Sequence, residues 1–364
     1  MRARRWIRGL SAGVGALALV ACGGSDDDEG YVATALVTDV AGMQNPYGGS
    51  SAHVDPNLVN AWGIAFNPQG FVWVANAGTS TSTLYDGNGV PQSLVVAIPP
   101  GARGEAEPTG IVFNASPAFP VTQNGLTGPS AFIFAGEAGT ISGWSPTVNL
   151  NNAVLVVDRS ADGAIYKGLA HATQGGADFV YATDFHNGVV DVFDARFTRV
   201  TSPGAFTDPN LPAGYAPFGI QTIGDRIYVS YALQDAAAAD DVTGAGLGMV
   251  NVFDTAGALV RRLISPGGRL NAPWGMTTAP ADFGPFSNSL LVANFGDGRI
   301  NAFDPATGNY LGTLSRSNGS AITIDGLWGI AFGNGINAQP TNTLFFTGGP
   351  ADESHGVYGR IVFR

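Results

Sequence analysis

Apolar runs alternate with glycine-rich polar turns along the whole chain, and one apolar run recurs six times around a glycine. The copies are NAWGIAF (60–66), EPTGIVF (107–113), YKGLAH (166–171), APFGIQ (216–221), APWGMT (272–277) and GLWGIAF (326–332). Successive glycines lie 47, 58, 51, 56 and 54 residues apart, at Gly63, Gly110, Gly168, Gly219, Gly275 and Gly329. A repeat of about fifty residues with strand-like patterning is typical of one four-stranded propeller blade. The spacing therefore predicts six blades.

Three further apolar segments follow the glycine phrases in a fixed order. Runs rich in β-branched and aromatic residues predict second strands at 71–77, 131–138, 178–185, 226–232, 289–295 and 343–348. Third strands share an ending, seen in VVDVFD (189–194), MVNVFD (249–254) and INAFD (300–304), with weaker versions at 82–86 and 140–144. Fourth strands are predicted at 93–98, 153–158, 197–200, 259–264 and 310–315. The sixth blade has no fourth strand of its own.

An unassigned strand near the start of the chain can serve as the missing fourth strand of the sixth blade. YVATALVTDV (31–40) precedes the first blade, and YGRIVFR (358–364) ends the chain as the third strand of the last blade. Pairing these two segments closes the ring and leaves no sheet edge at the seam. We therefore expect an all-β fold, a six-bladed β-propeller of four-stranded blades with a three-plus-one clasp in the last blade.

Composition agrees with one closed ring. The chain has 52 glycines and 22 prolines, and only 12% of its residues are charged. Because a ring spreads one core over all its blades, we expect residues 31–364 to form a single domain. Two segments interrupt the repeat: 115–130, which we expect to be a surface loop, and 232–248 in blade 4.

The first 22 residues are typical of an export signal. Arginines at positions 2, 4, 5 and 8 precede an apolar stretch that ends in Leu19-Val20-Ala21-Cys22, and Cys22 is the only cysteine. This pattern predicts a lipoprotein signal peptide (1–22) cut before a lipidated Cys22; the alternative is an ordinary signal peptide. Residues 23–30 then form a flexible acidic tether. We expect export and lipid anchoring in the cell envelope. Gly23 directly after the cysteine resembles the pattern that sorts Gram-negative lipoproteins to the outer membrane, so we expect that membrane.

Net charge limits the partners. Four of the 17 basic residues lie in the leader, so the rest of the chain has 13 basic against 28 acidic residues, a net charge of −15. Such a surface repels phosphate backbones and anionic headgroups. We therefore expect no nucleic acid, membrane contact only through the anchor, a monomer, and a small molecule, glycan or envelope protein as partner.

The glycine phrases place four aromatic residues at one repeat position, where the inner strands begin around the channel mouth. These are Trp62, Phe218, Trp274 and Trp328, with Lys167 at the same position in blade 3. One interpretation is an aromatic ring that stacks on sugars or apolar rings. The other is structural, with each ring wedged between neighbouring blades.

Polar residues follow the second strands on the same predicted face. They are Asn76, Glu137, Asp184, His186, Asn294 and Asp297. Asp184 and His186, with Lys167, are candidates for a coordinating or acid–base site. Asn and Asp are also common turn formers, which is the alternative for the whole set.

The blade 4 insertion carries Asp235, Asp240 and Asp241, a candidate site for Ca²⁺ or another divalent cation. Its spacing matches no known calcium loop, so a mobile lid over the channel is the competing interpretation. Outside the predicted leader, where residues 9–13 read GLSAG, the sequence contains no GxSxG motif, and nowhere does it contain a Walker A, HExxH or CxxC motif.

VANFGDGRINAFD (292–304) resembles NHL-repeat propellers, and DPNLVNAWGIAF (55–66) with GLWGIAFGNG (326–335) resembles a family of bacterial secreted propeller proteins. The resemblance implies the fold and an extracytoplasmic location, and no activity. Lactonase-type propellers hold a divalent cation with Glu, Asn and Asp, often with Asn before a strand-opening glycine. Here only Glu107 matches, as an acidic ligand.

Two functions therefore remain open. The first is a lipid-anchored ligand-binding or interaction module. The alternative is a lactonase or other hydrolase with a cation held by Glu107, Asp184, His186 and Asn294.

Overall fold

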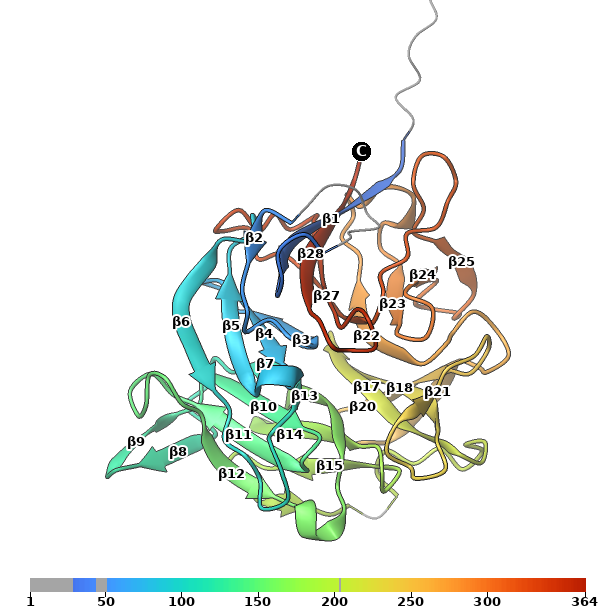
Figure 1. Cartoon of the computed structure of the whole chain (residues 1–364). Helices are drawn as coiled ribbons and strands as arrows, with labels where there is room; N and C mark the ends of the chain where they lie inside the picture. Colours follow the sequence, from blue (N-terminus) through green and yellow to red (C-terminus); the bar gives the residue numbers. More distant parts are fainter. Residues whose placement is uncertain (1–28, 44–50, 203) are drawn as a thin grey trace, which may run out of the picture.

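The computed structural model describes residues 29–43, 51–202 and 204–364, and these residues form a ring of six twisted sheets (Figure 1). Each predicted blade is one sheet with four main strands, so the six-bladed all-β propeller is confirmed. The only helices of the described residues are short 3-10 turns, η1 (Ala77–Thr79), η2 (Ser160–Asp162) and η3 (Gly284–Phe286). None of them is long and apolar enough to cross a membrane. The predicted leader, Cys22 and residues 23–28 of the tether lie outside the described residues.

In each blade, strands 1 to 4 follow one another from the channel to the outer edge of the ring. In blades 1 to 3 they are β3 (Ala61–Phe66), β4 (Val72–Asn76), β5 (Thr81–Tyr85) and β6 (Pro91–Ala97); β7 (Pro108–Phe113), β10 (Phe132–Gly136), β11 (Thr140–Trp144) and β12 (Val154–Asp158); β13 (Tyr166–Gln174), β14 (Ala177–Asp184), β15 (Val189–Phe193) and β16 (Arg199–Val200). In blades 4 and 5 they are β17 (Tyr215–Ile223), β18 (Arg226–Gln234), β20 (Met249–Asp254) and β21 (Leu259–Ile264); β22 (Pro273–Thr278), β23 (Leu290–Asn294), β24 (Ile300–Phe303) and β25 (Tyr310–Thr313).

Blade 6 is closed by the first strand of the chain. β26 (Leu327–Phe332), β27 (Leu344–Gly348) and β28 (Val357–Phe363) are completed by β1 (Tyr31–Thr38), which pairs antiparallel with β28 from Tyr31↔Phe363 to Thr38↔Val357. The predicted three-plus-one clasp is therefore confirmed. A short strand, β2 (His53–Val54), adds to β1 in parallel.

Strand direction defines two faces of the ring. Because neighbouring strands in each blade are antiparallel, the turns between strands 2 and 3 and the links into the next blade lie on one face, here called the loop face. The other turns lie on the opposite face, here called the far face.

Both interruptions of the repeat are more ordered than expected. The segment 115–130 is not an irregular surface loop, because β8 (Pro120–Gln123) and β9 (Leu126–Pro129) pair in it as a hairpin. Its turn is Asn124-Gly125, with φ of +51° and +78°, the combination that favours a tight hairpin turn. In blade 4, β19 (Asp241–Val242) pairs with the end of β18.

The repeated glycine allows each inner strand to lie against the next blade. A Cβ atom at Gly219 would lie 2.1 Å from the carbonyl oxygen of Trp274, and one at Gly275 would lie 2.5 Å from that of Trp328. The same holds where the ring closes: a Cβ atom at Gly329 of the last blade would lie 2.8 Å from the carbonyl oxygen of Trp62 in the first blade. Since real Cβ atoms do not approach this closely, these positions require glycine.

The shared ending of the third strands is a turn-forming aspartate. Oδ1 of Asp194 accepts hydrogen bonds from the amides of Arg196 and Thr198, both at 2.9 Å. Asp86, Asp254 and Asp304 cap equivalent far-face turns in the same way. The aspartate recurs because its side chain substitutes for backbone partners in a tight turn.

The hydrophobic core lies between neighbouring blades. Trp73 of blade 1 stacks on Phe132 of blade 2, with ring centroids 4.1 Å apart. Buried hydroxyl groups also join neighbouring blades by hydrogen bonds: Thr183 of β14 donates to the Phe218 carbonyl of the next blade at 2.6 Å. Each blade therefore depends on its neighbour for a dry contact surface.

Candidate functional site

Aromatic residues in the first halves of the inner strands, together with two from the turns between strands 2 and 3, fill the channel at the loop face. Trp62 and Trp328 stack with ring centroids 3.8 Å apart, and Phe295 stacks on the other side of Trp328 at 4.0 Å. Trp274 meets both indoles edge-on, and Phe218 packs against Trp328 and Phe185. We call these six residues the aromatic plug.

The plug bears on both interpretations of the aromatic positions. Trp62, Phe218 and Trp328 are at most 1% exposed, so their ring faces are covered by other rings and are not open to a sugar. The contacts favour the structural alternative: Trp62 and Trp328 stack between the neighbouring blades 1 and 6, and further ring contacts, such as Phe218 with Trp328, join blades that are not neighbours. The plug closes the channel and forms a floor for the loop face.

Lys167 lies on this floor. Its side chain is almost fully buried, and its ammonium group stands 5.4 Å from the centre of the Trp62 ring. Nζ forms ion pairs with Glu137 of blade 2 and, at 2.9 Å, with Oδ1 of Asp240 of blade 4. Burial alone would lower the pKa of Lys167, but the two carboxylates outweigh it, and the pKa is raised. Lys167 is therefore a permanent cation that joins three blades.

The blade 4 insertion folds over Lys167 as a lid, which we define as residues 235–241. Oδ1 of Asp235 accepts the amide of Ala239 at 2.9 Å, and the Asp235 amide donates to the Asp240 carbonyl at 2.8 Å. The ring Nδ1 of His186 contacts the Ala238 carbonyl at 3.3 Å. The lid interpretation is thus supported by contacts, and these contacts give the segment a defined fold.

The three aspartates of the insertion have separate roles. Asp235 caps its own turn, Asp240 pairs with Lys167, and burial raises the pKa of Asp241 to about 6. Within residues 29–43, 51–202 and 204–364 no group of three or more His, Cys, Asp or Glu side chains is placed to hold a metal ion.

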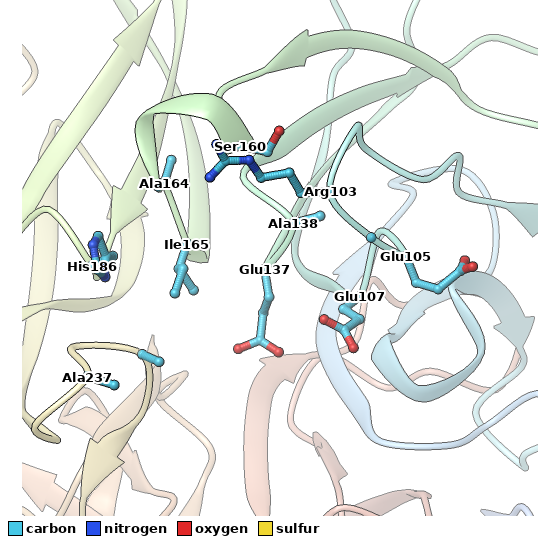
Figure 2. Close-up of a pocket in the computed structure, with 13 residues that line it drawn as sticks. Arg103, Glu105, Glu107, Glu137, Ala138, Ser160, Ala164, Ile165, His186 and Ala237 are labelled. Atoms are coloured by element: carbon cyan, nitrogen blue, oxygen red, sulfur yellow. The ribbon is translucent and has the colours of Figure 1, made fainter.

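A cavity of about 500 Å³ opens beside the lid (Figure 2). Glu105, Glu107 and Glu137 line one side, and His186 lies opposite. Apolar side chains cover the space between them: Ala138, Ala164, Ile165, Ala237 and Ala239. Among the described residues that line the cavity, Arg103 is the only lysine or arginine. Because Glu137 is already paired with Lys167, the excess of negative charge in the cavity comes from Glu105 and Glu107.

Glu107 projects into this cavity from a strained backbone. Its φ is +45°, a left-handed conformation that costs about 1 kcal/mol or more for a residue with a side chain. Desolvation, and then the neighbouring Glu137 carboxylate, raises the pKa of Glu107.

Glu353 belongs to the same loop face and was missed by the sequence analysis. Its Oε2 accepts a 2.6 Å hydrogen bond from Asn60, whose own Oδ1 accepts the indole N–H of Trp328 at 3.1 Å. Burial, and then the charge of Glu137, raises the pKa of Glu353 to about 7. The sequence signal that could have identified Glu353 is its position in the turn between strands 2 and 3 of blade 6, which corresponds to the position of Glu137 in blade 2.

The remaining predicted residues serve their own turns. Nδ2 of Asn76 donates to Thr81 and Thr83, and Nδ2 of Asn294 donates to the Arg269 carbonyl and to Asp297. Oδ1 of Asp184 accepts the amides of Ile165 and Asn187. These contacts favour the turn-forming interpretation. The structure therefore places Glu107, Glu137 and His186 in the cavity lining. Lys167 and Asp240 join Glu137 beside the cavity through ion pairs, whereas Asn76, Asp184 and Asn294 have structural roles.

Because Lys167 is the only lysine of the sequence, its reactivity reports on the lid. In the native protein we expect an N-hydroxysuccinimide ester to modify it slowly, as measured by mass spectrometry of the Lys167 peptide. Asp240→Asn removes one partner of the ammonium group and should speed labelling by about fivefold, which corresponds to about 1 kcal/mol. Asp282→Asn, which removes an exposed far-face charge, should have no effect. Equal rates in all three proteins would contradict the lid contact.

Sequence comparison places the chain close to viral proteins. It is 37% identical over 321 residues to the uncharacterized protein R648 of Acanthamoeba polyphaga mimivirus, covering 85% of this chain and 76% of that protein. It is 33% identical over 324 residues to protein L690 of the same virus, covering 86% and 82%. No family model matches the sequence.

Among solved structures, a Bacteroides thetaiotaomicron protein of unknown function superimposes with a TM-score of 0.55. It covers 92% of this chain and 76% of its own, with 9% sequence identity. At that identity the similarity supports the propeller fold alone.

Proposed function

Since the chain belongs to the family that includes the uncharacterized mimivirus proteins R648 and L690, and its fold is consistent with a binding module, we propose that it binds an organic cation at its loop face. The ligand class is an alkylammonium or guanidinium group on a short apolar stem. The proposal includes export and lipid anchoring through Cys22, which rest on the sequence pattern of residues 1–22.

The observation that carries the proposal is the 500 Å³ cavity with glutamates on one side and small apolar side chains beside them. Carboxylates that are partly desolvated attract a cation more strongly than carboxylates in water. The apolar lining suits a hydrocarbon stem, and an excess of acidic residues over the whole chain draws cations towards the protein.

Lys167 shows that this face already accommodates such a group. Its ammonium nitrogen is held by two carboxylates and faces the ring of Trp62, which are the contacts that an alkylammonium ligand requires. The ligand site proposed here lies next to these internal ion pairs, where, within the described part of the chain, no basic side chain forms an ion pair with Glu105 or Glu107.

A thermal-shift experiment tests the ligand class. Butylammonium and butylguanidinium should raise the Tm by about 4 °C at 100 times Kd, since a ligand of the native state stabilises it by mass action. Butanol and butyrate, which have the same stem without the positive charge, should leave the Tm unchanged.

Variants locate the effect. Glu107→Gln should weaken binding of the cations by about tenfold, because one attracting carboxylate is lost. Asp282→Asn removes the same charge from the far face and should bind normally. Equal shifts with butanol, or equal loss in both variants, would contradict a local cation site. A shift only with Ca²⁺, Mn²⁺ or Zn²⁺ that Asp184→Ala abolishes would instead support the lactonase alternative.

A further inference from the structure

The clasp also determines where the N-terminal segment leaves the propeller. Val357 of β28 follows the 349–356 turn on the loop face and pairs with Thr38, so the other end of β1, at Tyr31, lies on the far face. There the amide of Gly30 donates to the Arg364 carbonyl at 2.8 Å. The tether therefore joins the propeller at the far-face edge of blade 6.

The length of the tether limits how the propeller can turn. The eight residues 23–30 span at most about 29 Å. The eight residues of β1 already rise about 26 Å between the two faces. Nearly the whole tether would be used in running back along β1 before the loop face could meet the bilayer. A tether this short therefore favours the far face towards the lipid and leaves almost no slack for the opposite orientation.

Exposed apolar side chains collect on this same face. Among residues 29–43, 51–202 and 204–364, 14 large hydrophobic side chains are exposed, and ten of them lie in far-face turns or in the strand halves next to these turns. The ten are Val32, Val90, Leu126, Leu150, Leu155, Val200, Val260, Tyr310, Leu311 and Ile336. The two most exposed are Leu150 (56%) and Leu126 (54%). Exposed apolar side chains gathered on one face are typical of a contact surface.

Leu126 and Leu150 are held near each other on blade 2. Leu126 follows the turn of the β8–β9 hairpin, which projects from the ring (Figure 1). Nδ2 of Asn149 donates to Oε1 of Gln123 at 2.7 Å, which fixes the hairpin beside the turn that carries Leu150.

We infer that the far face is a lipid-contacting surface, with Leu126 and Leu150 at the headgroup boundary and the loop-face cavity turned away from the bilayer. This inference rests on the proposed lipid anchor at Cys22. The capping aspartates of the far-face turns, such as Asp194 and Asp254, disfavour anionic headgroups, so the partner surface is a zwitterionic one.

Hydrogen exchange on the anchored full-length product tests the orientation. Protein purified from membranes is placed in phosphatidylcholine vesicles and compared with the Cys22→Ser variant, which has no acylation site. Anchoring should slow exchange in peptides covering 120–129 and 145–155 by about threefold or more, because these amides become shielded. Peptides covering 235–242 on the loop face should exchange at the same rate in both proteins.

Matched variants and the mass of the N-terminal peptide separate the possible failures. Leu126→Ser should reduce the protection, whereas Val242→Ser, a loop-face position of similar character, should not. An acylated N-terminal peptide without far-face protection would overturn the orientation and leave the anchor intact. A peptide without acyl chains would overturn the anchor, and the orientation with it. Protection that rises with protein concentration in Cys22→Ser would show that a second copy covers this face, which also overturns the inference.

Discussion

Replacing Gly219 with alanine is expected to destabilise the propeller by about 3 kcal/mol, the upper part of the range for overpacking a tight site. The added Cβ would lie 2.1 Å from the backbone oxygen of Trp274, so β17 and β22 would have to separate. Backbone atoms in a closed ring have little freedom to move, because each inner strand also contacts the blade on its other side.

Thermal unfolding followed by circular dichroism measures this effect, and the Tm should fall by about 4 °C. Gly268→Ala is the matched control, since a Cβ there would meet no atom within 4 Å and its φ is not in the left-handed region. The control should stay within about 0.5 kcal/mol of the original protein. If both variants unfolded alike, close approach of the inner strands would not explain the repeated glycine.

The second large effect concerns pH. Glu353 has a pKa of about 7 in the folded protein against 4.5 as its ordinary value, so the native state binds this proton more tightly than the unfolded state does. Its contribution to stability is therefore fully present below pH 4.5 and is lost as the pH rises through about 7. A difference of this size corresponds to about 3 kcal/mol. The pKa of Asp241 is raised to about 6, so its contribution to stability is also lost as the pH rises.

Glu353→Gln isolates this contribution. The amide keeps an acceptor for Asn60 and carries no charge at any pH. We expect the variant to be about as stable as the original at pH 5 and more stable by about 3 kcal/mol at pH 8. Urea unfolding at pH 5, 6, 7 and 8 measures both curves, and the comparison cancels other groups that titrate in this range, such as Asp241 with its pKa of about 6. Parallel curves would show that Glu353 does not carry a raised pKa.

The fold was predictable because its determinants repeat. Six glycines mark inner strands that must approach the next blade, and the recurrent aspartate marks a turn with one geometry. The glycine and the aspartate each meet a local geometric requirement, so each recurs from blade to blade and can be recognised in the sequence. The hairpin at 115–130 had a local signal as well, in Asn124-Gly125, but the proline-rich surroundings obscured the alternation of its strands.

The site was only partly predictable, because its contacts join distant parts of the chain. Asp240 meets Lys167 from 73 residues away, and Asn60 meets Glu353 across 293 residues. Glu353 also depends on three consecutive left-handed residues, 351–353, none of which is glycine. No pattern of residue types indicates such a turn. The aromatic positions were identified correctly from the repeat, but only the geometry of the ring shows that they meet on the axis.

The seam in blade 6 has a consequence for the order of assembly. A chain made from its N-terminus exposes β1 first, yet the partner of β1 is β28, more than 300 residues later. During synthesis β1 therefore has no partner until β28 has been made. A nascent chain that stalls before β28 would present two unpaired sheet edges, which makes this seven-residue strand a checkpoint for ring closure.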